Sequence, residues 1–309
     1  ISIKPENPDA YLHIADIRET RGDLELSISE LRASLEQMPD NVAIHQRIGD
    51  ECLSLEKLDD AIKEYNTCMN ISPSDAAAAK GLTRAYYLKA AKESGGAFFV
   101  SNDVESAKRQ IEKAIQLNPN DMELRLAMAK IRSMSGETVD LNAIGAPRTD
   151  GERVAYAEAL LAQNKFKDSQ DQMNIVIGNA SDQKQAFSVA DLALMIKDLD
   201  SADAAYKKGG TFNGGEERSR RGLDLVKKAR EGSRQDLTLA ADLAKRKQLN
   251  SAVDKYHSAI YQNPRVADAR IGLADALEKV TPATPANLRE AIVQIKAYMS
   301  LRPDLPPKK

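Results

Sequence analysis

The fold is decided by residues 42–75, which read VAIHQRIGDECLSLEKLDDAIKEYNTCMNISPSD. Two short patterns of helical spacing are joined there by a polar turn, and Pro73 ends the second one. The residues that share a face are His45, Ile48, Gly49 and Cys52 on the first helix, and Ala61, Tyr65 and Cys68 on the second. A single hairpin of this kind cannot bury its apolar face alone, so the sequence predicts neighbouring hairpins of the same kind.

Proline repeats at the same period elsewhere in the chain. Pro5, Pro39 and Pro73 lie 34 residues apart, and Pro119, Pro264 and Pro303 end later helical patterns. A 34-residue helix–turn–helix period with a proline after the second helix resembles the tetratricopeptide repeat (TPR) family. The resemblance implies an all-α solenoid of helix-turn-helix repeats, wound into a right-handed superhelix. It is specific for the fold and says little about the ligand.

The resemblance covers nearly the whole chain but is weak in the middle. Two central hairpins, expected at 152–180 and 182–210, are degenerate repeats that end in glycine rather than proline. Residues 137–152, ETVDLNAIGAPRTDGE, read as a loop or single turn where a second helix should stand. We therefore expect an N-terminal array of about 3.5 repeats over 1–140 and a C-terminal array over 150–309, with a soft boundary at 140–150.

Two small-residue sites of the first repeat are occupied by serine. Ser27 and Ser34 fall where the family usually has alanine. We expect both side chains to pack, with their hydroxyls bonded back to the preceding turn of their own helix.

An insertion interrupts the third repeat. Pro119 follows Pro73 by 12 residues more than one period, and the excess lies between two predicted helices, near 94–102. Phe98, Phe99 and Val100 lie in this insertion. Either the loop folds back and buries them against a hairpin, or they form an exposed apolar contact for a partner or for self-association.

A basic helix is predicted at about 216–231, outside the regular phase and before the next regular hairpin, which starts near 236. Its cations are Arg218, Arg220, Arg221, Lys227, Lys228 and Arg230. Such a helix can bind nucleic acid or an anionic membrane surface. Acidic residues in the same segment reduce its net positive charge, however, and no aromatic residues are interleaved with the cations. We therefore expect a solvated face and no nucleic-acid partner.

Composition agrees with a helical array that exposes a charged surface. Charged residues make up 29% of the chain and aromatic residues 5%, with no Trp, and the net charge of −2 argues against a polyanion binder. No apolar run is long enough to span a membrane. Residues 1–5, ISIKP, look like the end of a preceding repeat, so we expect the chain to begin inside a longer array. The compartment, cytoplasmic or periplasmic, therefore stays undecided, because a targeting segment can lie upstream.

No catalytic constellation is visible. The histidines are His13, His45 and His257, each in a different repeat, and His45 falls on a packing face. Cys52 and Cys68 also fall on packing faces and are expected to be small core residues, with a disulfide or redox pair as the alternative. No His/Cys cluster has metal spacing, and no Gly-rich loop follows a strand. The sequence therefore predicts no catalytic residue, no metal site and no cofactor.

What remains is a surface. In the family that the chain resembles, the first helix of each hairpin lines a concave groove that binds peptides. The corresponding residues here are Leu12, Asp16, Gln46, Asp50, Lys80, Arg84, Tyr87, Leu126 and Lys130. They run from acidic to basic, which suits a peptide held by charge at both ends, with Tyr87 and Leu126 as apolar contacts. The alternative is that these charges only keep an open face in solution.

The resemblance thus implies a non-enzymatic scaffold or adaptor that binds a protein or peptide segment in its concave groove. A second hypothesis makes the chain a TPR spacer in a larger bacterial envelope or secretion assembly. The sequence does not name the partner in either case.

Overall fold

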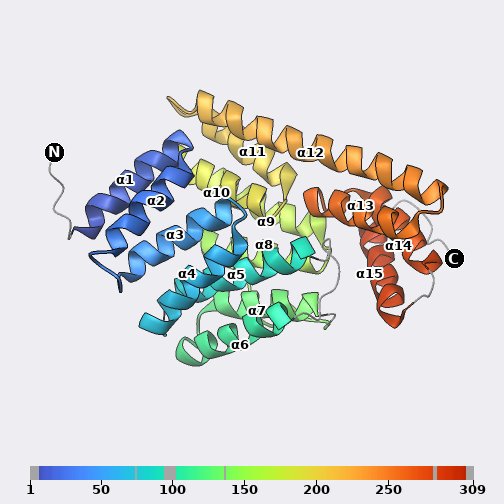
Figure 1. The fold of residues 1–309 in the computed structure, drawn as a ribbon, viewed down its shortest axis with the longest axis horizontal. Helices are drawn as coiled ribbons and strands as arrows, with labels where there is room; N and C mark the ends of the chain where they lie inside the picture. Colours follow the sequence, from blue (N-terminus) through green and yellow to red (C-terminus); the bar gives the residue numbers. More distant parts are fainter. Residues whose placement is uncertain (1–6, 74, 94–101, 136, 281–283, 304–309) are drawn as a thin grey trace. The chain divides into compact units, whose positions relative to one another are not determined.

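The computed structural model describes residues 7–73, 75–93, 102–135, 137–280 and 284–303, and Figure 1 shows them as helices joined by short connections. The helices are α1 (Pro8–Arg21), α2 (Leu24–Leu35), α3 (Val42–Ser54), α4 (Leu58–Ile71), α5 (Ala76–Glu93), α6 (Asn102–Leu117), α7 (Met122–Met134), α8 (Asp150–Ala162), α9 (Phe166–Asn179), α10 (Gln183–Met195), α11 (Leu199–Gly210), α12 (Glu216–Lys245), α13 (Leu249–Gln262), α14 (Ala267–Lys279) and α15 (Pro285–Leu301). No strand occurs in these ranges, and the predicted all-α class is confirmed.

The chain divides into two compact units. The first comprises Ile1–Lys89 and Asn102–Met128, and the second comprises Ala90–Ser101 and Ala129–Lys309. In the first unit α1 packs on α2, and α3 packs on α2 and α4. In the second unit the hairpins are α8–α9, α10–α11, α12–α13 and α14–α15. The division into arrays 1–140 and 150–309 stays a prediction.

Five hairpin turns within the described residues use one residue each in the left-handed region. Gly22 has φ 81°, and the residues at the equivalent place in later hairpins are Glu56, Asn164, Lys197 and Lys247, with φ of 55°, 58°, 63° and 63°. Only glycine adopts this conformation without a steric penalty from its side chain. The same turn therefore recurs along the chain because helix packing on both sides requires it, even where the residue disfavours it.

A tyrosine of one hairpin packs onto a glycine of the next helix in three places. A Cβ atom added to Gly81 would lie 2.4 Å from the Tyr65 ring, and one added to Gly272 would lie 2.5 Å from the Tyr256 ring. At Gly222 the distance to the Tyr206 ring would be 2.2 Å. Each tyrosine precedes its glycine by 16 residues. These contacts are how successive hairpins are stacked, because they let a large ring fill the space between two closely approaching helices.

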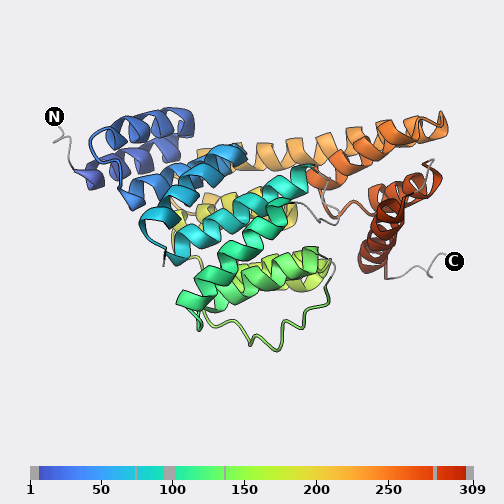
Figure 2. The same ribbon diagram turned by 60° about the horizontal axis from the view of Figure 1, so that its bottom comes forward.

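The basic segment is not a separate helix out of phase, as the sequence suggested. It forms the first half of α12, a continuous helix of 30 residues that Figures 1 and 2 show beside α11 and α13. The buried residues of α12 that form one stripe are Ser219, Val226, Ser233 and Ala240, spaced by seven. Seven residues are close to two helical turns, so these side chains share one face. Since α11 and α13 both pack on α12, the helix serves two hairpins in succession.

The expectation for the two serines holds in one case only. Ser34 Oγ donates to the Leu31 carbonyl, 2.7 Å away, on its own helix. Ser27 Oγ instead donates to Glu51 Oε1 on α3, 2.8 Å away. A buried carboxylate is a stronger acceptor than a carbonyl that is already bonded within its helix, so it takes the hydroxyl.

The loop predicted after α7 is present. Residues 137–149 form no helix beyond a short turn, and Leu141 is buried in it. Helix α5 ends at Glu93, and helix α6 begins at Asn102. The insertion between them, with Phe98, Phe99 and Val100, lies outside the described residues.

Candidate functional site

Three first helices of the first unit carry the candidate residues in register. Leu12, Gln46 and Lys80 are 34 residues apart, and so are Asp16, Asp50 and Arg84. We call these six residues the inner row. None of the six is buried, and α1 lies against α3. Equivalent positions of successive repeats are thus presented on neighbouring helices.

Arg47 joins the acidic end of the inner row to the core. Its Nη2 lies 3.1 Å from Asp16 Oδ1 and 2.9 Å from Glu19 Oε2, both on α1. Its Nε donates to Glu51 Oε1, 2.9 Å away on its own helix. Glu51 is buried, and burial raises its pKa while the bonds from Arg47 and Ser27 oppose that rise. One guanidinium therefore fixes the orientation of α1 relative to α3.

Two other side chains of the inner row, Lys80 and Gln46, have partners inside the same unit. Lys80 Nζ lies 2.6 Å from Glu123 Oε2 on α7, and Gln46 Nε2 donates to Asp75 Oδ1 at 3.4 Å. The predicted gradient from acid to base is thus built of residues that already interact across repeats. These contacts hold the side chains in position, which lowers the entropy that a ligand must remove on binding.

Asp50 takes part in a contact that recurs in the second unit. Tyr65 donates its hydroxyl to Asp50 Oδ1, 2.5 Å away, and Tyr206 donates to Asp191 Oδ1, 2.6 Å away. Burial, reinforced by the carboxylate, raises the pKa of each tyrosine above its ordinary value, so the phenol stays a donor. Asp50 is therefore held by the same tyrosine that stacks the hairpins.

The remaining candidates do not join the inner row. Leu126 is fully buried, and Lys130 is buried in an ion pair with Glu158 at 2.5 Å, so neither side chain offers a contact surface. Tyr87 lies in α5, but its side chain is outside the described part of the chain.

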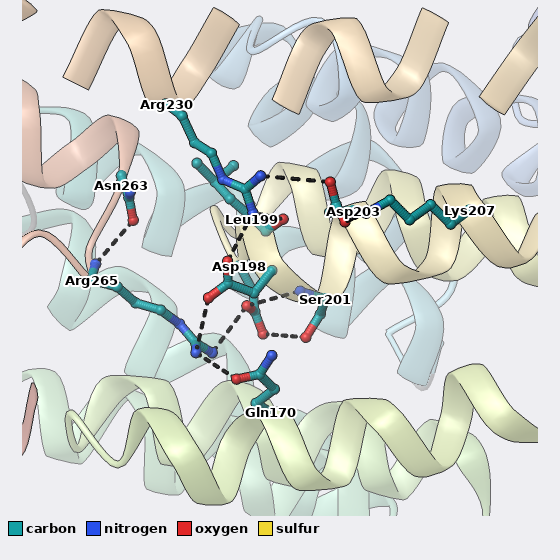
Figure 3. Close-up of polar contacts among 10 residues, drawn as sticks. Gln170, Asp198, Leu199, Ser201, Asp203, Lys207, Arg230, Asn263 and Arg265 are labelled. Atoms are coloured by element: carbon teal, nitrogen blue, oxygen red, sulfur yellow. Dashed lines mark hydrogen bonds and ion pairs between the residues drawn. The ribbon is translucent and has the colours of Figure 1, made fainter. Parts of the chain in front are cut away.

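A second polar cluster, which the sequence did not indicate, lies in the second unit. We call it the junction, and Figure 3 shows it around Arg265, in the turn after α13. Arg265 Nη1 donates to Gln170 Oε1 at 2.8 Å, and its Nη2 donates to the Phe166 carbonyl at 3.2 Å. Nη2 also donates to Asp198 Oδ1 at 3.1 Å, and the side chain of Asp198 is wholly buried. The guanidinium thus connects α13 to α9 and to the start of α11.

Helix α12 contributes to the same junction from its middle. Arg230 Nη2 lies 2.8 Å from Asp200 Oδ1, and its Nη1 lies 3.5 Å from Asp203 Oδ1 on α11 (Figure 3). Asp198 also caps α11, because its Oδ1 accepts from the Ser201 backbone N–H at 3.4 Å, and its Oδ2 accepts from Ser201 Oγ at 2.8 Å. Anionic groups at the start of a helix are favoured by its dipole. The two arginines therefore pair with the carboxylates at the first turn of α11 from two later elements.

Six basic residues of α12 have acidic neighbours. Arg218 pairs with Asp191 at 2.6 Å and Arg230 with Asp200. The pairs within α12 are Arg220–Glu217, Arg221–Glu217, Lys227–Glu231 and Lys228–Asp224. The exclusion of nucleic acid stays a prediction, and these pairs are its physical reason because they reduce the positive potential.

The described residues offer little for bond-making chemistry. Among them no three His, Cys, Asp or Glu side chains gather closely enough to hold a metal ion. Cys52 and Cys68 are free and buried, as expected of core residues, and burial raises their thiol pKa values to about 11 and about 12. His45 is buried as predicted, 2.7 Å from Glu64 and 2.8 Å from the Pro39 carbonyl. Within the described helices, no segment combines the length and apolarity that a membrane span requires.

Two signals in the sequence could have indicated the structure of α12. Tyr206 precedes Gly222 by the same 16 residues that separate Tyr65 from Gly81, which places 216–231 in phase with the preceding hairpin. The stripe of small and apolar residues at intervals of seven then continues past Gly232. The junction gave no comparable signal, because Arg265 and the partners of its side chain are 65 to 99 residues apart.

Comparison with known proteins finds one matching family and several similar solved structures. Residues 42–75 match a family described as the tetratricopeptide repeat. A tetratricopeptide repeat protein from Parabacteroides merdae is 16% identical, with 72% of this chain and 86% of that chain covered and a TM-score of 0.43. No match is found among curated proteins.

Two further solved structures are similar at the same low level. The APC/C hetero-tetramer Cut9–Hcn1 is 14% identical over 99% of this chain and 55% of that chain, with a TM-score of 0.43. The TPR domain of P58(IPK) is 16% identical over 96% of this chain and 84% of that chain, with a TM-score of 0.28.

Proposed function

Because the chain is a tetratricopeptide repeat protein, we propose that it is a non-enzymatic scaffold that binds a protein or peptide segment along the inner row. Proteins of this repeat type generally serve as interaction scaffolds. The observation that carries the finer proposal is the register of the inner row, in which equivalent positions of three repeats offer exposed or half-buried side chains.

The chemistry of the inner row favours an extended segment with both charge signs. Asp16 and Asp50 stand at one end, and Lys80 and Arg84 at the other. The segment would place cations beside α1 and α3 and anions beside α5, exchanging partners with Arg47 and Glu123. Such exchange gives specificity and salt dependence more than raw affinity, because the charges lose existing ion pairs when they bind.

The test is affinity capture from the source lysate, with a double variant and a matched control. Lys80→Ala/Arg84→Ala removes two cations from α5. Arg109→Ala/Lys113→Ala removes two exposed cations from α6, the outer helix of the same hairpin. We expect a bound protein that the α5 variant loses and the α6 variant keeps, with circular dichroism showing both variants folded.

The same experiment has outcomes that oppose the proposal. Equal capture by both variants would place binding elsewhere on the chain. Capture of nothing by the wild type would instead agree with a spacer whose binding parts lie in other components.

A further inference from the structure

Both nitrogens of the buried His45 ring face hydrogen-bond acceptors. Nδ1 lies 2.7 Å from Glu64 Oε2 on α4, and Nε2 lies 2.8 Å from the Pro39 carbonyl oxygen in the turn before α3. The side chains of His45 and Glu64 are only 11% and 9% exposed. A backbone carbonyl cannot donate, and an ionised carboxylate only accepts. Both ring nitrogens must therefore carry a hydrogen atom, unless the carboxyl group of Glu64 supplies one.

These two contacts fix the number of protons that the pair of side chains holds. A neutral imidazole has one N–H, so beside an ionised Glu64 it would place a lone pair opposite an oxygen at hydrogen-bond distance. One added proton removes this repulsion, because it lies between Nδ1 and Oε2 while the N–H at Nε2 donates to Pro39. The proton belongs to the pair, whichever of the two groups carries it. The folded pair thus binds one proton more than a neutral histidine and a carboxylate that are apart.

The second unit makes the same connection with a side chain that keeps its protons. Arg270 is buried and follows Pro264 by six residues, as His45 follows Pro39. Its Nε donates to the Pro264 carbonyl at 2.8 Å, and its Nη1 donates to Gln294 Oε1 on the second helix of its hairpin, also at 2.8 Å. A guanidinium remains a donor at every pH at which proteins are handled. The buried position six residues after the proline therefore supplies two donors in both units.

The charged groups near the pair come from α2 and α4. Arg32 Nη2 on α2 lies 3.8 Å from Glu64 Oε1 and 3.4 Å from Asp60 Oδ2. The nearby thiols of Cys52 and Cys68 stay neutral, because burial raises their pKa values to about 11 and about 12. The charged groups that approach α3 from α1 and from the turn before α5 are Asp16 and Glu19, which both pair with Arg47, and Asp75, which accepts from Gln46. Among all these groups, histidine is the side chain whose ordinary titration falls between about pH 5 and pH 8.

From this geometry we propose that His45 and Glu64 form a proton-dependent clamp on the turn that joins the first two hairpins. With its extra proton the pair holds the Pro39 carbonyl. As the pH rises the pair releases that proton, the bond to Pro39 is lost, and the turn between α2 and α3 loosens. Because the folded pair binds more protons than the separated groups of the unfolded chain, its contribution to stability falls as the pH rises.

The clamp acts without a ligand, and so it goes beyond the proposed scaffold function. The turn joins the hairpin that carries Asp16 to the hairpin that carries Asp50. Its loosening therefore changes how the acidic end of the inner row is presented.

Hydrogen-exchange mass spectrometry of the full 309-residue chain between about pH 5 and pH 8 tests the clamp, with rates corrected for the intrinsic effect of pH. In the wild type, protection of the amides in residues 38–46 should fall at least about tenfold as the pH rises, because a charge-assisted hydrogen bond is lost. Residues 264–272, which Arg270 holds through the Pro264 carbonyl, are the internal control and should keep their protection.

Two variants remove the need for the extra proton in different ways. His45→Arg supplies permanent donors, as Arg270 does. Glu64→Gln gives a neutral ring an amide that can donate to Nδ1, so that Nε2–H can still donate to Pro39. Each variant should keep residues 38–46 protected throughout the range. His13→Gln, which changes an exposed histidine on α1, is the matched control and should lose protection as the wild type does.

A wild type whose protection at 38–46 does not change with pH would overturn the proposal. So would a loss that residues 264–272 share, or one that persists in Glu64→Gln, because the responsible group would then lie elsewhere. Since residues 38–46 and 264–272 are compared within the wild-type chain, the result holds even where a variant folds poorly.

Discussion

Three tyrosines make the same packing contact, in which the ring lies against the glycine 16 residues later. They are Tyr65, Tyr206 and Tyr256. The ring fills the space between two hairpins, and the glycine allows the next helix to approach it. Where the first helix also supplies an aspartate, as Asp50 and Asp191 do, the phenol gains a charged acceptor. The same residue therefore sets both the spacing of the hairpins and the orientation of a carboxylate on the first helix.

The thiols of Cys52 and Cys68 should react slowly in the folded protein. Both are fully buried, and their raised pKa values leave almost no thiolate at neutral pH. We expect labelling by a disulfide reagent at pH 8 to be at least about 100-fold slower than in urea. Complete labelling of the native protein within the mixing time would contradict this assignment.

Removing one partner of the buried Lys130–Glu158 ion pair should destabilise the protein more than removing both. Lys130→Met leaves a buried carboxylate without its cation, and we expect the free energy of unfolding to fall by about 3 kcal/mol. Lys130→Met/Glu158→Leu removes both charges and should recover most of that loss. Urea unfolding followed by circular dichroism measures both variants. A double variant less stable than the single one would show that the pair itself is stabilising.

At the scale of elements, α12 departs most from a simple repeat. Its first half packs on α11 in the ordinary phase, and its second half packs on α13. Between them Ser233 Oγ donates to the Ala259 carbonyl, 2.8 Å away, and Gly232 makes room for the Gln262 side chain. Two weak helix formers are therefore kept inside a helix because each has a role in packing against α13.

Gly222→Ala tests the packing of α11 on α12. The added methyl group would overlap the Tyr206 ring, so despite better helix propensity we expect a loss of about 2 kcal/mol in the free energy of unfolding. Gly178→Ala on α9 is the control, because no atom lies within 4 Å of its added Cβ, and it should be neutral or slightly stabilising. Urea midpoints compare the two, and an equal effect would mean that the Tyr206 contact does not restrain the helices.

The elements show what the sequence could and could not predict. Hairpins such as α3–α4 were predictable because each is local and buries residues at helical spacing. The continuity of α12 was missed because Gly232 and Ser233 read as a break, although the stripe of residues at intervals of seven continues past them. In the inner row the sequence placed the residues correctly on first helices. It did not reveal that Lys80 is paired with Glu123, since ion pairs between repeats depend on side-chain reach.

At the scale of the whole molecule, contacts between residues far apart in the sequence decide how the second unit behaves. A repeat array touches mainly its neighbours, so its stability is roughly a sum of local terms. The junction departs from this rule because Arg265 contacts α9 and α11, and Ser300 on α15 donates to the Asn164 carbonyl in the turn before α9. The C-terminal hairpins are thereby coupled to hairpins two and three units earlier.

Arg265→Ala should loosen this coupling. It leaves Asp198 buried with fewer partners, so we expect amide exchange at 166–170 and 198–202 to become at least about tenfold faster, equivalent to about 1.4 kcal/mol. Arg246→Ala, which removes an exposed pair with Asp242 on α12, is the control and should change nothing at these sites. Hydrogen-exchange mass spectrometry reads both variants. Unchanged exchange in Arg265→Ala would mean that the second unit behaves as an ordinary array.

The double use of α12 also has a consequence during synthesis. When the first half of α12 leaves the ribosome, α11 is already complete and can receive it. Gln262, the last residue of α13, is added 29 residues after Ser233, which is about 1.5–6 s later at ordinary elongation rates. Until then the second half of the helix has no partner, and an unsupported helix of that length is marginal in water. The longest helix among the described residues is thus completed in two stages, with an interval in which the apolar residues of its second half, such as Ala240, lack their partner helix.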